Sequence, residues 1–475
     1  MRKILFTIAV VMLSSVAVGQ SRTALKKLFD KGDFVEAKAM AKKMLKGNPK
    51  NSEYSYWYAA SCLETGDTVD VREMLEFAVS RKIVNAHRYL GDYHFGKENY
   101  PAAQECYENF LEMTKDDSLR IVFSQKANMA KTVARMVMST AKICVVDSFV
   151  VAKDKFLSVY RLGNDVGVVT TNATYFDDNS LPGYINETER GMDIFFSDFG
   201  EYNDSLMKLY HSSKVADEWS TPLQLEGFET YGNDDYPFMC SDGLTLYFAS
   251  DGKGSIGGYD IFMTNMDSET GRFLRPDNVG MPFNSMANDY MLVIDEVTGL
   301  GWFASDRNQP EGLVCVYLFV PNTAKEKYNT DKLGYNGVLP FAKLSSIAAT
   351  QTDEEVIRKA RLQLTMLLYP DEDKTESSDF LFVIDDTRDY KMLSDFKSPE
   401  ARKLFSEWQT RTRLLKSDIA SLEQFREQYS SANAVTKEKM APAILDLERK
   451  VEDEEHALVL MEYEIRKIEQ EKIYK

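Results

Sequence analysis

The spacing of hydrophobic positions changes twice along the chain, and these changes divide it into three parts. From residue 21 to about 115, apolar residues recur every three or four positions in short runs, which is typical of amphipathic helices. Beyond Ile143, apolar and β-branched residues form runs such as 144–151, which indicate β-strands. From residue 398 onward the three-to-four spacing returns over two long, highly charged segments.

Regularly spaced turns divide the first part into helical hairpins. The turn positions Gly32, Gly66 and Lys97 follow one another at intervals close to the period of the tetratricopeptide repeat (TPR), which is about 34 residues. Hairpins of this kind bury their apolar faces only by stacking on one another. We therefore expect about three hairpins, closed by a capping helix at residues 126–140.

The third hairpin shows the pattern most clearly. It places Tyr100 at the turn and small residues at Gly91 and Ala103, an arrangement that resembles a TPR. Small side chains at these two positions predict that the two helices of the hairpin approach each other closely.

A long repeat occupies the central part of the chain. Its most complete copy, residues 236–264, consists of strand-like runs separated by an Asp242-Gly243 turn and a glycine-rich link. Weaker copies surround it, and the triplet Phe/Ala-Ser-Asp begins at positions 196, 249 and 304, which gives a long and nearly constant period. Because Asp-Gly and Gly-Gly pairs supply tight turns between aromatic and β-branched runs, the repeat predicts blades of a β-propeller.

Three blades are recognisable, and they end near Pro321. A closed propeller usually has at least four blades, so the missing strands are expected from residues 165–175 and 380–385. An insertion at 322–379 is expected to contain one helix, residues 353–368, and an acidic loop. The sequence therefore predicts an irregular propeller.

The last part of the chain predicts two long helices. Residues 404–429 and 444–468 keep apolar residues three or four positions apart, and Ser430–Ala434 interrupts the pattern. Pro442 suits the first turn of the second helix. Two helices joined by a short loop form an antiparallel hairpin. This hairpin either packs on the chain's own propeller or protrudes as an arm that binds a partner.

The central repeat resembles a known family. Residues 241–251 (Ser-Asp-Gly-Leu-Thr-Leu-Tyr-Phe-Ala-Ser-Asp), followed by 258–262 (Gly-Tyr-Asp-Ile-Phe), are similar to the TolB-type, WD40-like β-propeller repeat. Residues 275–280 and 282–285 resemble the version of this repeat found in Bacteroidota. In that group such repeats often follow TPR helices in periplasmic proteins, which include PorE-like components of type IX secretion.

The resemblance covers roughly residues 21–320 and implies a periplasmic binding protein. PorE-like chains also carry an OmpA-like domain that binds peptidoglycan, and that domain has no counterpart here. Any contact of this chain with peptidoglycan is therefore expected to be indirect.

The N-terminus predicts export. Two basic residues, an apolar run at residues 4–18 and small residues before a cleavage site between Gly19 and Gln20 form a signal peptide. The apolar run is too short to span a bilayer comfortably, and no other stretch is apolar enough to do so. We expect a periplasmic protein without a transmembrane segment, and association with the outer membrane is left open.

The net charge and the cysteine content of the chain limit its possible partners and its redox chemistry. The net charge of −17 disfavours nucleic acids and anionic lipid surfaces as partners. The cysteines are widely spaced and form no CxxC motif, so we interpret them as small buried residues, although export would allow one disulfide. They are Cys62, Cys106, Cys144, Cys240 and Cys315.

Only weak matches to catalytic patterns occur in the chain. The nearest approach to Gly-x-Ser-x-Gly is residues 253–257, in which Lys253 replaces the first glycine. His87 and His94 are expected to pack between helices rather than to bind zinc. Asp251 and Asp260 loosely imitate a calcium loop, which we interpret as a turn. The sequence predicts no enzyme, no cofactor and no metal site.

An acidic motif repeats in the predicted propeller. Residues 233–236 (Asn-Asp-Asp-Tyr) align with 287–290 (Ala-Asn-Asp-Tyr), just before a strand in each case, so that Asp235 corresponds to Asp289. One interpretation is that Asp235 and Asp289 lock equivalent turns, because Asp side chains commonly bond the backbone of a turn. The other is a polar partner-binding rim on one face of the propeller. Its candidate residues are Asp234, Asp235, Asp251, Asp289, Asp306 and Arg307.

The predicted fold is a multidomain α + β protein. Its parts are a signal peptide (1–19), a TPR-like α-helical solenoid (20–141), an all-β WD40-like propeller with its insertion (142–392) and a C-terminal antiparallel helical hairpin or coiled coil (393–475). The first functional hypothesis is a non-catalytic periplasmic scaffold or adaptor in an envelope or secretion assembly. It would bind envelope proteins or peptides through its TPR groove and propeller face. The competing hypothesis is a glycan-binding or glycan-cleaving propeller, which convergent carboxylates and exposed aromatic residues would support.

Overall fold

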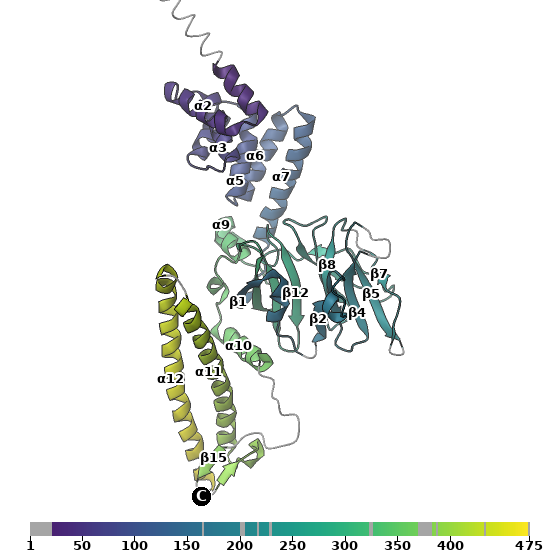
Figure 1. Ribbon diagram of the computed structural model, residues 1–475, viewed down its shortest axis with the longest axis vertical. Coiled ribbons are helices and arrows are strands. Elements are labelled where there is room, and N and C mark those ends of the chain that lie inside the picture. The colour runs from purple at the N-terminus through teal and green to yellow at the C-terminus, as the bar shows by residue number, and fades with distance from the viewer. Residues whose placement is uncertain are drawn as a thin grey trace, which may run out of the picture. The chain divides into compact units, whose positions relative to one another are not determined.

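The chain divides by its internal contacts into two units (Figure 1). The computed structural model describes residues 21–163, 166–199, 205–215, 218–227, 230–322, 326–368, 382–385, 388–431 and 434–473. The predicted signal peptide, with Gly19 and Gln20, and the acidic loop at 371–379 lie outside these residues. One unit is helical and comprises the chain through Ala141 together with Gly280–Pro282 and Lys327–Lys343. The other unit contains the sheets and the C-terminal helices.

The helical unit begins with consecutive helices that pack on their neighbours (Figure 1). Asn51 Oδ1 accepts a hydrogen bond from Tyr54 N at 3.0 Å, and Asp116 Oδ1 accepts one from Leu119 N at 3.0 Å. These polar caps fix where α3 and α7 start. The predicted capping helix is α7, which begins earlier than expected. The helices are residues 21–31, α2 (Phe34–Gly47), α3 (Ser52–Glu64), α4 (Val71–Ser80), α5 (Val84–Gly96), α6 (Tyr100–Met113) and α7 (Asp117–Met138).

A further helix from later in the chain completes this unit. α9 (Thr330–Ala342) packs against α7, and the Tyr335 hydroxyl donates a hydrogen bond to the Glu98 carbonyl at 2.8 Å. The expectation of a single helix within the insertion at 322–379 is therefore wrong. α9 was not recognised in the sequence because it contains glycines, and one of them, Gly334 with φ 64°, interrupts its helical backbone.

Three antiparallel sheets form the centre of the second unit, and none of them closes into a barrel in the described part of the chain (Figure 1). Most strands that are consecutive in sequence are hydrogen-bonded neighbours within their sheet. The first sheet contains β2 (Val168–Thr171), β3 (Tyr184–Glu187), β4 (Asp193–Asp198), β5 (Lys208–Val215), β6 (Glu218–Trp219) and β7 (Leu223–Gln224). The second contains β8 (Asp234–Met239), β9 (Thr245–Ser250), β10 (Asp260–Asn265) and β11 (Asp277–Asn278). The third contains β12 (Asp289–Asp295), β13 (Leu300–Ser305) and β14 (Leu313–Val320).

The third sheet takes its fourth strand from the beginning of the unit. β1 (Cys144–Ala152) pairs antiparallel with β14, and Ser148 lies opposite Tyr317. The strand-like run at 144–151 is thus an edge strand of the last sheet. The strand expected within 165–175 is β2, which lies at the edge of the first sheet.

One aromatic side chain lies where the three sheets meet. Phe156, in the 3-10 helix η1 (Lys153–Val159), is buried and contacts one tyrosine of each sheet. Its ring centroid is 5.8 Å from that of Tyr184, 6.2 Å from that of Tyr236 and 6.4 Å from that of Tyr290. The three sheets therefore share an aromatic core instead of each burying its apolar face separately.

The helix predicted at 353–368 is present as α10 (Glu354–Leu368). It packs on the third sheet, where Ala360 is buried in the same apolar cluster as Trp302. Just before it, η3 (Ala348–Thr350) brings the Thr350 hydroxyl within 3.0 Å of Val145 N, which donates to it.

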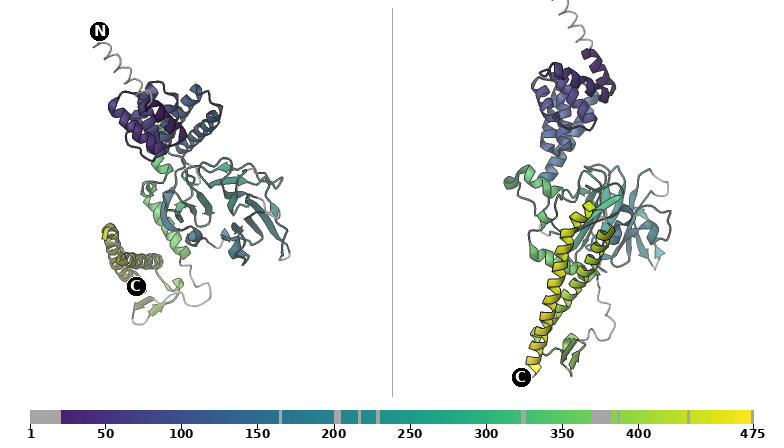
Figure 2. Two further views of the ribbon diagram at one scale, coloured as in Figure 1. Left: turned by 45° about the horizontal axis from the view of Figure 1, so that its top comes forward. Right: turned by 60° about the vertical axis from the view of Figure 1, so that its left-hand side comes forward.

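The C-terminal helices α11 (Pro399–Ser431) and α12 (Ala434–Ile473) run antiparallel (Figure 2). Ion pairs join Arg411 to Glu454 at 2.6 Å and Arg426 to Glu448 at 2.6 Å, so later residues of α11 face earlier residues of α12. No helix in the described ranges combines the length and the hydropathy needed to cross a bilayer. Buried residues along the seam include Leu415, Leu422, Ile444, Val451, Leu458, Met461 and Ile465.

Two expectations about this region are wrong. β15 (Phe382–Asp385) pairs with β16 (Arg388–Tyr390), and the Phe382 ring packs on Phe405 of α11 with centroids 4.8 Å apart. This strand therefore belongs with the C-terminal helices and completes no propeller blade. Pro442 lies inside α12 and not in its first turn. Packing against α11 continues the helix through the one backbone hydrogen bond that Pro442 removes.

Gly91 provides a test of the close packing of α5 on α6. A Cβ atom at Gly91 would lie 2.5 Å from Cε1 of Tyr107, whose ring is buried and whose hydroxyl donates to Asp92 at 2.8 Å. We predict that Gly91→Ala destabilises the helical unit by about 1–3 kcal/mol, because the ring cannot move without losing that hydrogen bond. Thermal melting followed by circular dichroism would measure the change.

Gly96→Ala is the matched control on the same helix, because a Cβ atom there would meet nothing within 4 Å. Alanine is favoured over glycine in helices by about 1 kcal/mol, so this variant should melt at the wild-type temperature or above it. Equal melting temperatures for the two variants would contradict a close approach at Gly91.

Candidate functional site

Strand pairing corrects the alignment of the two acidic motifs. Asp234 lies opposite Ser250 across β8 and β9, and Asp289 lies opposite Ser305 across β12 and β13. Asp234 rather than Asp235 is therefore the equivalent of Asp289, and the two motifs align one position away from the predicted match. The predicted alignment of Asp235 with Asp289 is wrong because it matched residue types without the strand register.

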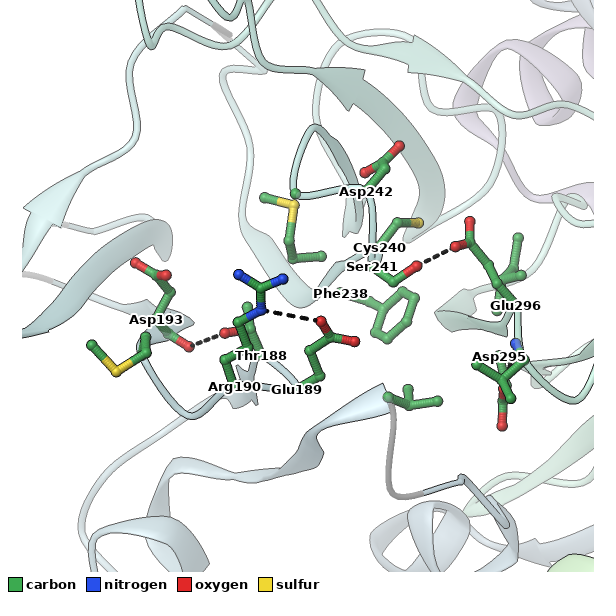
Figure 3. A pocket seen from close by; sticks show the side chains of 16 residues that line it. Thr188, Glu189, Arg190, Asp193, Phe238, Cys240, Ser241, Asp242, Asp295 and Glu296 are labelled. Carbon is green, nitrogen blue, oxygen red and sulfur yellow. Dashed lines mark hydrogen bonds and ion pairs between the residues drawn. The ribbon is translucent and has the colours of Figure 1, made fainter.

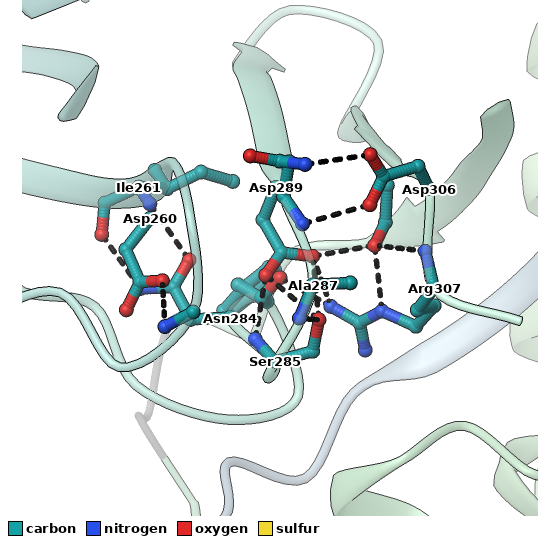
Figure 4. A network of polar contacts seen from close by, with 12 residues as sticks. Asp260, Ile261, Asn284, Ser285, Ala287, Asp289, Asp306 and Arg307 are labelled. Carbon is teal, nitrogen blue, oxygen red and sulfur yellow. Dashed lines mark hydrogen bonds and ion pairs between the residues drawn. The ribbon is translucent and has the colours of Figure 1, made fainter. Parts of the chain in front are cut away.

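Asp289 is the centre of a buried polar network (Figure 4). Its carboxylate accepts hydrogen bonds from Ser285 N at 2.5 Å and from the Ser305 hydroxyl at 2.5 Å, and it pairs with Arg307 Nη2 at 2.6 Å. The same nitrogen of Arg307 donates to the Phe283 carbonyl at 2.6 Å. The network ties the loop before β12 to the end of β13.

Asp234 occupies the same place in the second sheet but has different partners. The Thr230 hydroxyl donates to its carboxylate at 2.8 Å, and Lys208 Nζ pairs with it at 3.0 Å. Because Lys208 belongs to β5, this ion pair joins the first and second sheets. Burial raises the pKa of Asp234, although the hydrogen bonds and Lys208 oppose that shift.

Asp251 and Asp306 make a second repeated contact. Asp251 accepts hydrogen bonds from N and Nδ2 of Asn233 at 2.7 and 2.8 Å, and Asp306 accepts them from the same atoms of Asn288 at 2.7 and 2.7 Å. Each pair joins the residue that follows one strand to the residue that precedes the neighbouring strand. Asp251 is exposed and Asp306 is half-buried.

The predicted partner-binding rim therefore contains both buried and accessible residues. Four of its six residues are bonded inside the protein, as the turn-lock interpretation requires, and a partner cannot reach them in this conformation. Asp251 and Asp306 remain accessible, and binding by them stays a prediction. The four buried residues have exposed fractions of 1% (Asp234), 6% (Asp235), 0% (Asp289) and 4% (Arg307).

Two residues from the segments that resemble the Bacteroidota repeat, Asn278 and Asn284, form hydrogen bonds with β10 of the second sheet. The buried Asn284 accepts a hydrogen bond from Ile261 N at 2.7 Å and donates to Ile261 O at 2.8 Å, as a neighbouring strand would (Figure 4). Asn278 Nδ2 donates to Asp260 at 2.6 Å. Burial, with the charge of Asp289 nearby, raises the pKa of Asp260 to about 7.

The candidate catalytic and metal patterns form turns and helix packing. The Ser255 hydroxyl donates to the Gly258 carbonyl at 2.5 Å, and Asp260 accepts from Ile256 N at 3.1 Å. His87 and His94 are half-buried in α5, and burial lowers both pKa values. Within the described ranges, no group of three or more His, Cys, Asp or Glu side chains is placed to hold a metal ion.

The five cysteines all lie in the described residues, and they are free thiols. Cys144 is half-buried and the other four are buried, which agrees with their interpretation as small packed residues. Burial raises the pKa of each thiol. This disfavours the thiolate that disulfide exchange and metal binding require.

A recess lies where one turn from each of the three sheets converges (Figure 3). Its volume is about 280 Å³, and it is lined by the β3–β4, β8–β9 and β12–β13 turns. No single sheet could form it. The polar lining residues are Thr188, Glu189, Arg190, Asp193, Cys240, Ser241, Asp242, Asp295 and Glu296.

Carboxylates dominate the electrostatics of this recess. Five of them line it, whereas its one basic residue, Arg190, has a side chain that is 83% exposed. Asp242 accepts hydrogen bonds from Leu244 N at 2.8 Å and Thr245 N at 2.8 Å. Burial alone would raise the pKa of Asp242, but hydrogen bonds from Thr245 and Leu244 outweigh it and lower the pKa. Asp242 is therefore ionised at neutral pH.

The Ser241–Gly243 turn was visible in the sequence, but its convergence with two other turns was not. The repeat period carries the missing signal, because Glu189, Asp242 and Val297 follow one another at the same intervals as the repeated triplets. Superposing the three repeats would have placed these turns at equivalent positions of their blades.

The helical unit contains an open recess between α6 and α7, with a volume of about 540 Å³. Lys131 and Arg135 are the charged residues that line it, although the chain as a whole has a net charge of −17. This recess is therefore a basic feature on an acidic protein. The remaining lining residues are Gln104, Asn128, Thr132, Ala134 and Met138.

Comparison with known proteins finds similarity for the helical region. No protein-family model and no curated protein matches the chain. The N-terminal helical region resembles solved TPR domains. One is the first TPR of Spaghetti (RPAP3) bound to an HSP90 peptide, which is 18% identical with a TM-score of 0.21 over 23% of this chain and 88% of that chain.

Two further TPR structures are similar to a comparable extent. The Sgt2 TPR domain from Aspergillus fumigatus is 20% identical, with a TM-score of 0.22 over 25% of this chain and 81% of that chain. The first TPR domain of human RPAP3 is 19% identical, with a TM-score of 0.20 over 23% of this chain and 92% of that chain.

Asp289 and Asp251 provide a test of the turn-lock interpretation. We predict that Asp289→Ala destabilises the sheet unit by about 3–5 kcal/mol, because it leaves the buried Arg307 guanidinium without its carboxylate. Asp251→Ala, which removes an exposed contact, should cost only about 1 kcal/mol. Thermal melting of the full chain compares the two. If Asp289→Ala melts like the wild type and loses partner binding instead, the rim interpretation is correct and the turn-lock interpretation is wrong.

Asp235 provides a test of pH dependence. Burial raises its pKa to about 6 from an ordinary value of 3.8, although Ser197 Oγ, Tyr236 N and Tyr184 N all donate to its Oδ1. At pH values between these two pKa values, the Asp235 carboxyl group is therefore protonated in the folded state but ionised in the unfolded state. The free energy of unfolding consequently falls as pH rises through this window. Asp235→Asn keeps the acceptor oxygen and removes the charge.

We predict that Asp235→Asn gains stability relative to the wild type as pH rises from 4 to 7, by up to about 3 kcal/mol. Melting temperatures measured across this pH range check the prediction. Asp242→Asn should show the opposite slope, because the pKa of Asp242 is lowered in the folded state. A difference between Asp235→Asn and the wild type that stays constant with pH would contradict the burial of an ionisable carboxyl group here.

Proposed function

We propose that this chain is a non-catalytic, exported scaffold that binds protein partners in the cell envelope. The observation that carries the proposal is the helical unit, in which consecutive helices stack and the turns at Gly32, Gly66 and Lys97 recur at nearly the TPR period. Repeats of this kind create extended surfaces on which other chains bind.

The surface of the helical unit offers exchangeable polar contacts. Arg22 pairs with Glu53 at 2.6 Å, and Lys126 pairs with Asp92 at 2.6 Å, and all four side chains remain partly exposed. The first pair links the first helices of two successive hairpins, and the second links the third hairpin to the capping helix α7. Because exposed ion pairs contribute little to stability, a partner can replace them at small cost.

The recess between α6 and α7 fits an acidic segment of a partner. Lys131 and Arg135 project from one face of α7, and the lining contains no carboxylate in the part of the chain described. Opposite charge steers association and suppresses wrong partners. An acidic peptide or helix is therefore the partner chemistry that this unit favours.

We also infer that the three sheets are blades of an irregular, WD40-like propeller. The long repeat of the central sequence, the four strands of the second and third sheets and the shared contact with Phe156 support this arrangement. β1 would close the arrangement, because it completes the last blade with the first strand of the unit. A second binding module on the same chain raises the effective concentration for a second contact.

A periplasmic location is supported by the signal-peptide pattern of the N-terminus. The resemblance of residues 241–262 to TolB-type repeats supports a role in an envelope or secretion assembly. In such an assembly the chain would bind envelope proteins or peptides, and any contact with peptidoglycan would be indirect.

A glycan-binding or glycan-cleaving role is the second candidate function. The observation that favours it is the recess of Figure 3, where carboxylates from three sheets converge, since glycosidases act with paired carboxylates. Phe238 is the aromatic residue among those that line the recess, and it is 1% exposed, so it offers no stacking surface to a sugar. The scaffold role is therefore the better supported of the two.

Charge reversal in the helical recess provides a test of the scaffold proposal. We expect the tagged chain to capture partner proteins from an envelope extract. The amount of an acidic partner captured by the double variant Lys131→Glu/Arg135→Glu should be at least about tenfold lower than for the wild type, because two repulsive charges replace two attractive ones. Quantitative mass spectrometry of the captured proteins measures the difference.

Lys42→Glu/Lys43→Glu in α2 is the matched control, because it changes the net charge equally at exposed positions outside this recess. Equal capture by both double variants, each folded at the wild-type melting temperature, would contradict binding at the recess. Release of sugars from glycan substrates, abolished by Glu296→Gln, would favour the second candidate function.

A further inference from the structure

The side of α12 that faces away from α11 carries an exposed apolar surface. Val459, Leu460 and Tyr463 are 64%, 58% and 69% exposed, whereas Leu458 and Met461 on the other side of the helix are buried in the hairpin seam. Val459, Leu460 and Tyr463 are called the α12 outer patch below. Adjacent apolar residues on a solvent-facing helix commonly mark an interaction site.

Leu460 and Tyr463 of the α12 outer patch belong to a regular stripe. Asp453, His456, Leu460, Tyr463 and Lys467 follow one another at spacings of three and four residues, and all five are exposed. This is the heptad spacing with which one helix packs on another. α12 therefore carries a second line of residues at this spacing, on the side that α11 leaves uncovered.

Opposite charges flank the patch at equal distances. Asp453 is an exposed acid one heptad before Leu460, and Lys467 is an exposed base one heptad after it. Leu460 thus lies midway between the two opposite charges. The stripe is therefore complementary in charge to a second copy of itself that runs in the opposite direction.

We propose that the α12 outer patch is the contact between two copies of this chain, whose α12 helices pack antiparallel about a two-fold axis at Leu460. In this arrangement Asp453 of each copy faces Lys467 of the other, and Leu460 packs on Leu460 of the other copy. Two-fold symmetry repeats each favourable pair, so one sequence pattern supplies both halves of the interface.

The charge pattern selects this occupant and this orientation. Parallel packing would place Asp453 against Asp453 and Lys467 against Lys467, which is unfavourable because like charges repel. A patch that merely packed on another part of the chain would not need charges arranged symmetrically about its centre. The inference goes beyond the proposed scaffold function and does not depend on it.

The size of the stripe sets the expected strength. From Asp453 to Lys467 it extends about 21 Å along the helix. A single helix pair of this length is at the small end of the range for stable interfaces. We therefore expect a reversible dimer whose population rises with protein concentration.

Sedimentation velocity of the full chain over a range of concentrations provides the test. The wild type should shift from monomer to dimer as its concentration rises. Leu460→Lys should weaken association at least about tenfold, because it places a charge at the two-fold axis of an apolar contact. Ile121→Lys in α7 is the matched control, since Ile121 is 65% exposed outside the hairpin, and it should dimerise like the wild type.

A charge swap provides a test of the antiparallel pairing itself. Asp453→Lys and Lys467→Asp should each weaken the dimer by about five- to tenfold, because each substitution breaks two symmetric pairs. The double variant Asp453→Lys/Lys467→Asp restores opposite charges across the interface and should recover wild-type affinity. A double variant that is as weak as the single variants would overturn the antiparallel arrangement.

Three other outcomes would overturn the proposal. The first is a wild-type chain that stays monomeric at every concentration. The second is a monomer in which hydrogen exchange shows the α12 outer patch protected, because the patch then packs on the same chain. The third is a patch that binds a different protein while the chain forms no dimer.

Discussion

The packing of Phe156 between three sheets is the interaction on which the sheet unit depends. An antiparallel sheet with one apolar face is stable only when another element covers that face. Here each sheet contributes one tyrosine to a common centre, and Phe156 fills the space between them. Tyr160 fixes the same segment a turn later, because its hydroxyl donates to the Met291 carbonyl at 2.7 Å and its ring stacks near Trp302. A short 3-10 helix thus organises three sheets that share no strand.

Polar ties connect the sheets around this apolar centre. Asn186 of the first sheet accepts a hydrogen bond from Met239 N of the second at 2.8 Å, and Asp235 of the second sheet accepts one from Tyr184 N of the first at 3.2 Å. A buried polar group without a partner costs about 1–3 kcal/mol, so each of these side chains is tolerated because it finds one. This explains why the repeated acidic motif is buried: it joins sheets that have no backbone ladder between them. Of the acids that line the recess in Figure 3, Glu189, Asp242 and Glu296 belong to the turns.

The sequence predicts what local spacing determines and fails where register or tertiary contact decides. Apolar residues three or four apart identified α10, α11 and the early helices, because a helix that packs on one side needs that spacing. α9 escaped because Gly334 breaks its backbone and because its contacts are with helices near the beginning of the chain. The alignment of Asp235 with Asp289 failed because an Asp-Tyr pair recurs in both motifs at an offset of 54 residues (289 − 235), whereas the strand pairs Asp234–Ser250 and Asp289–Ser305 recur at 55 (289 − 234). The recess exists only after three sheets have packed, so no single segment encodes it.

The path of the chain imposes an order on its assembly. Ala141 N donates to Met281 O at 2.8 Å, and Tyr328 N donates to Thr140 O at 3.3 Å, so the end of α7 is tied to two segments from much later in the chain. Contacts between distant residues form after local ones, because the entropy of closing the loop must be overcome first. The early helices can therefore stack before α9 joins them, and the third sheet must wait for β14 before it can bind β1. The described apolar clusters of α11 and α12 contain only residues from Phe382 onward, so the core of this hairpin waits for none of these contacts. A module that completes its own core in this way can keep its second helix face for another molecule.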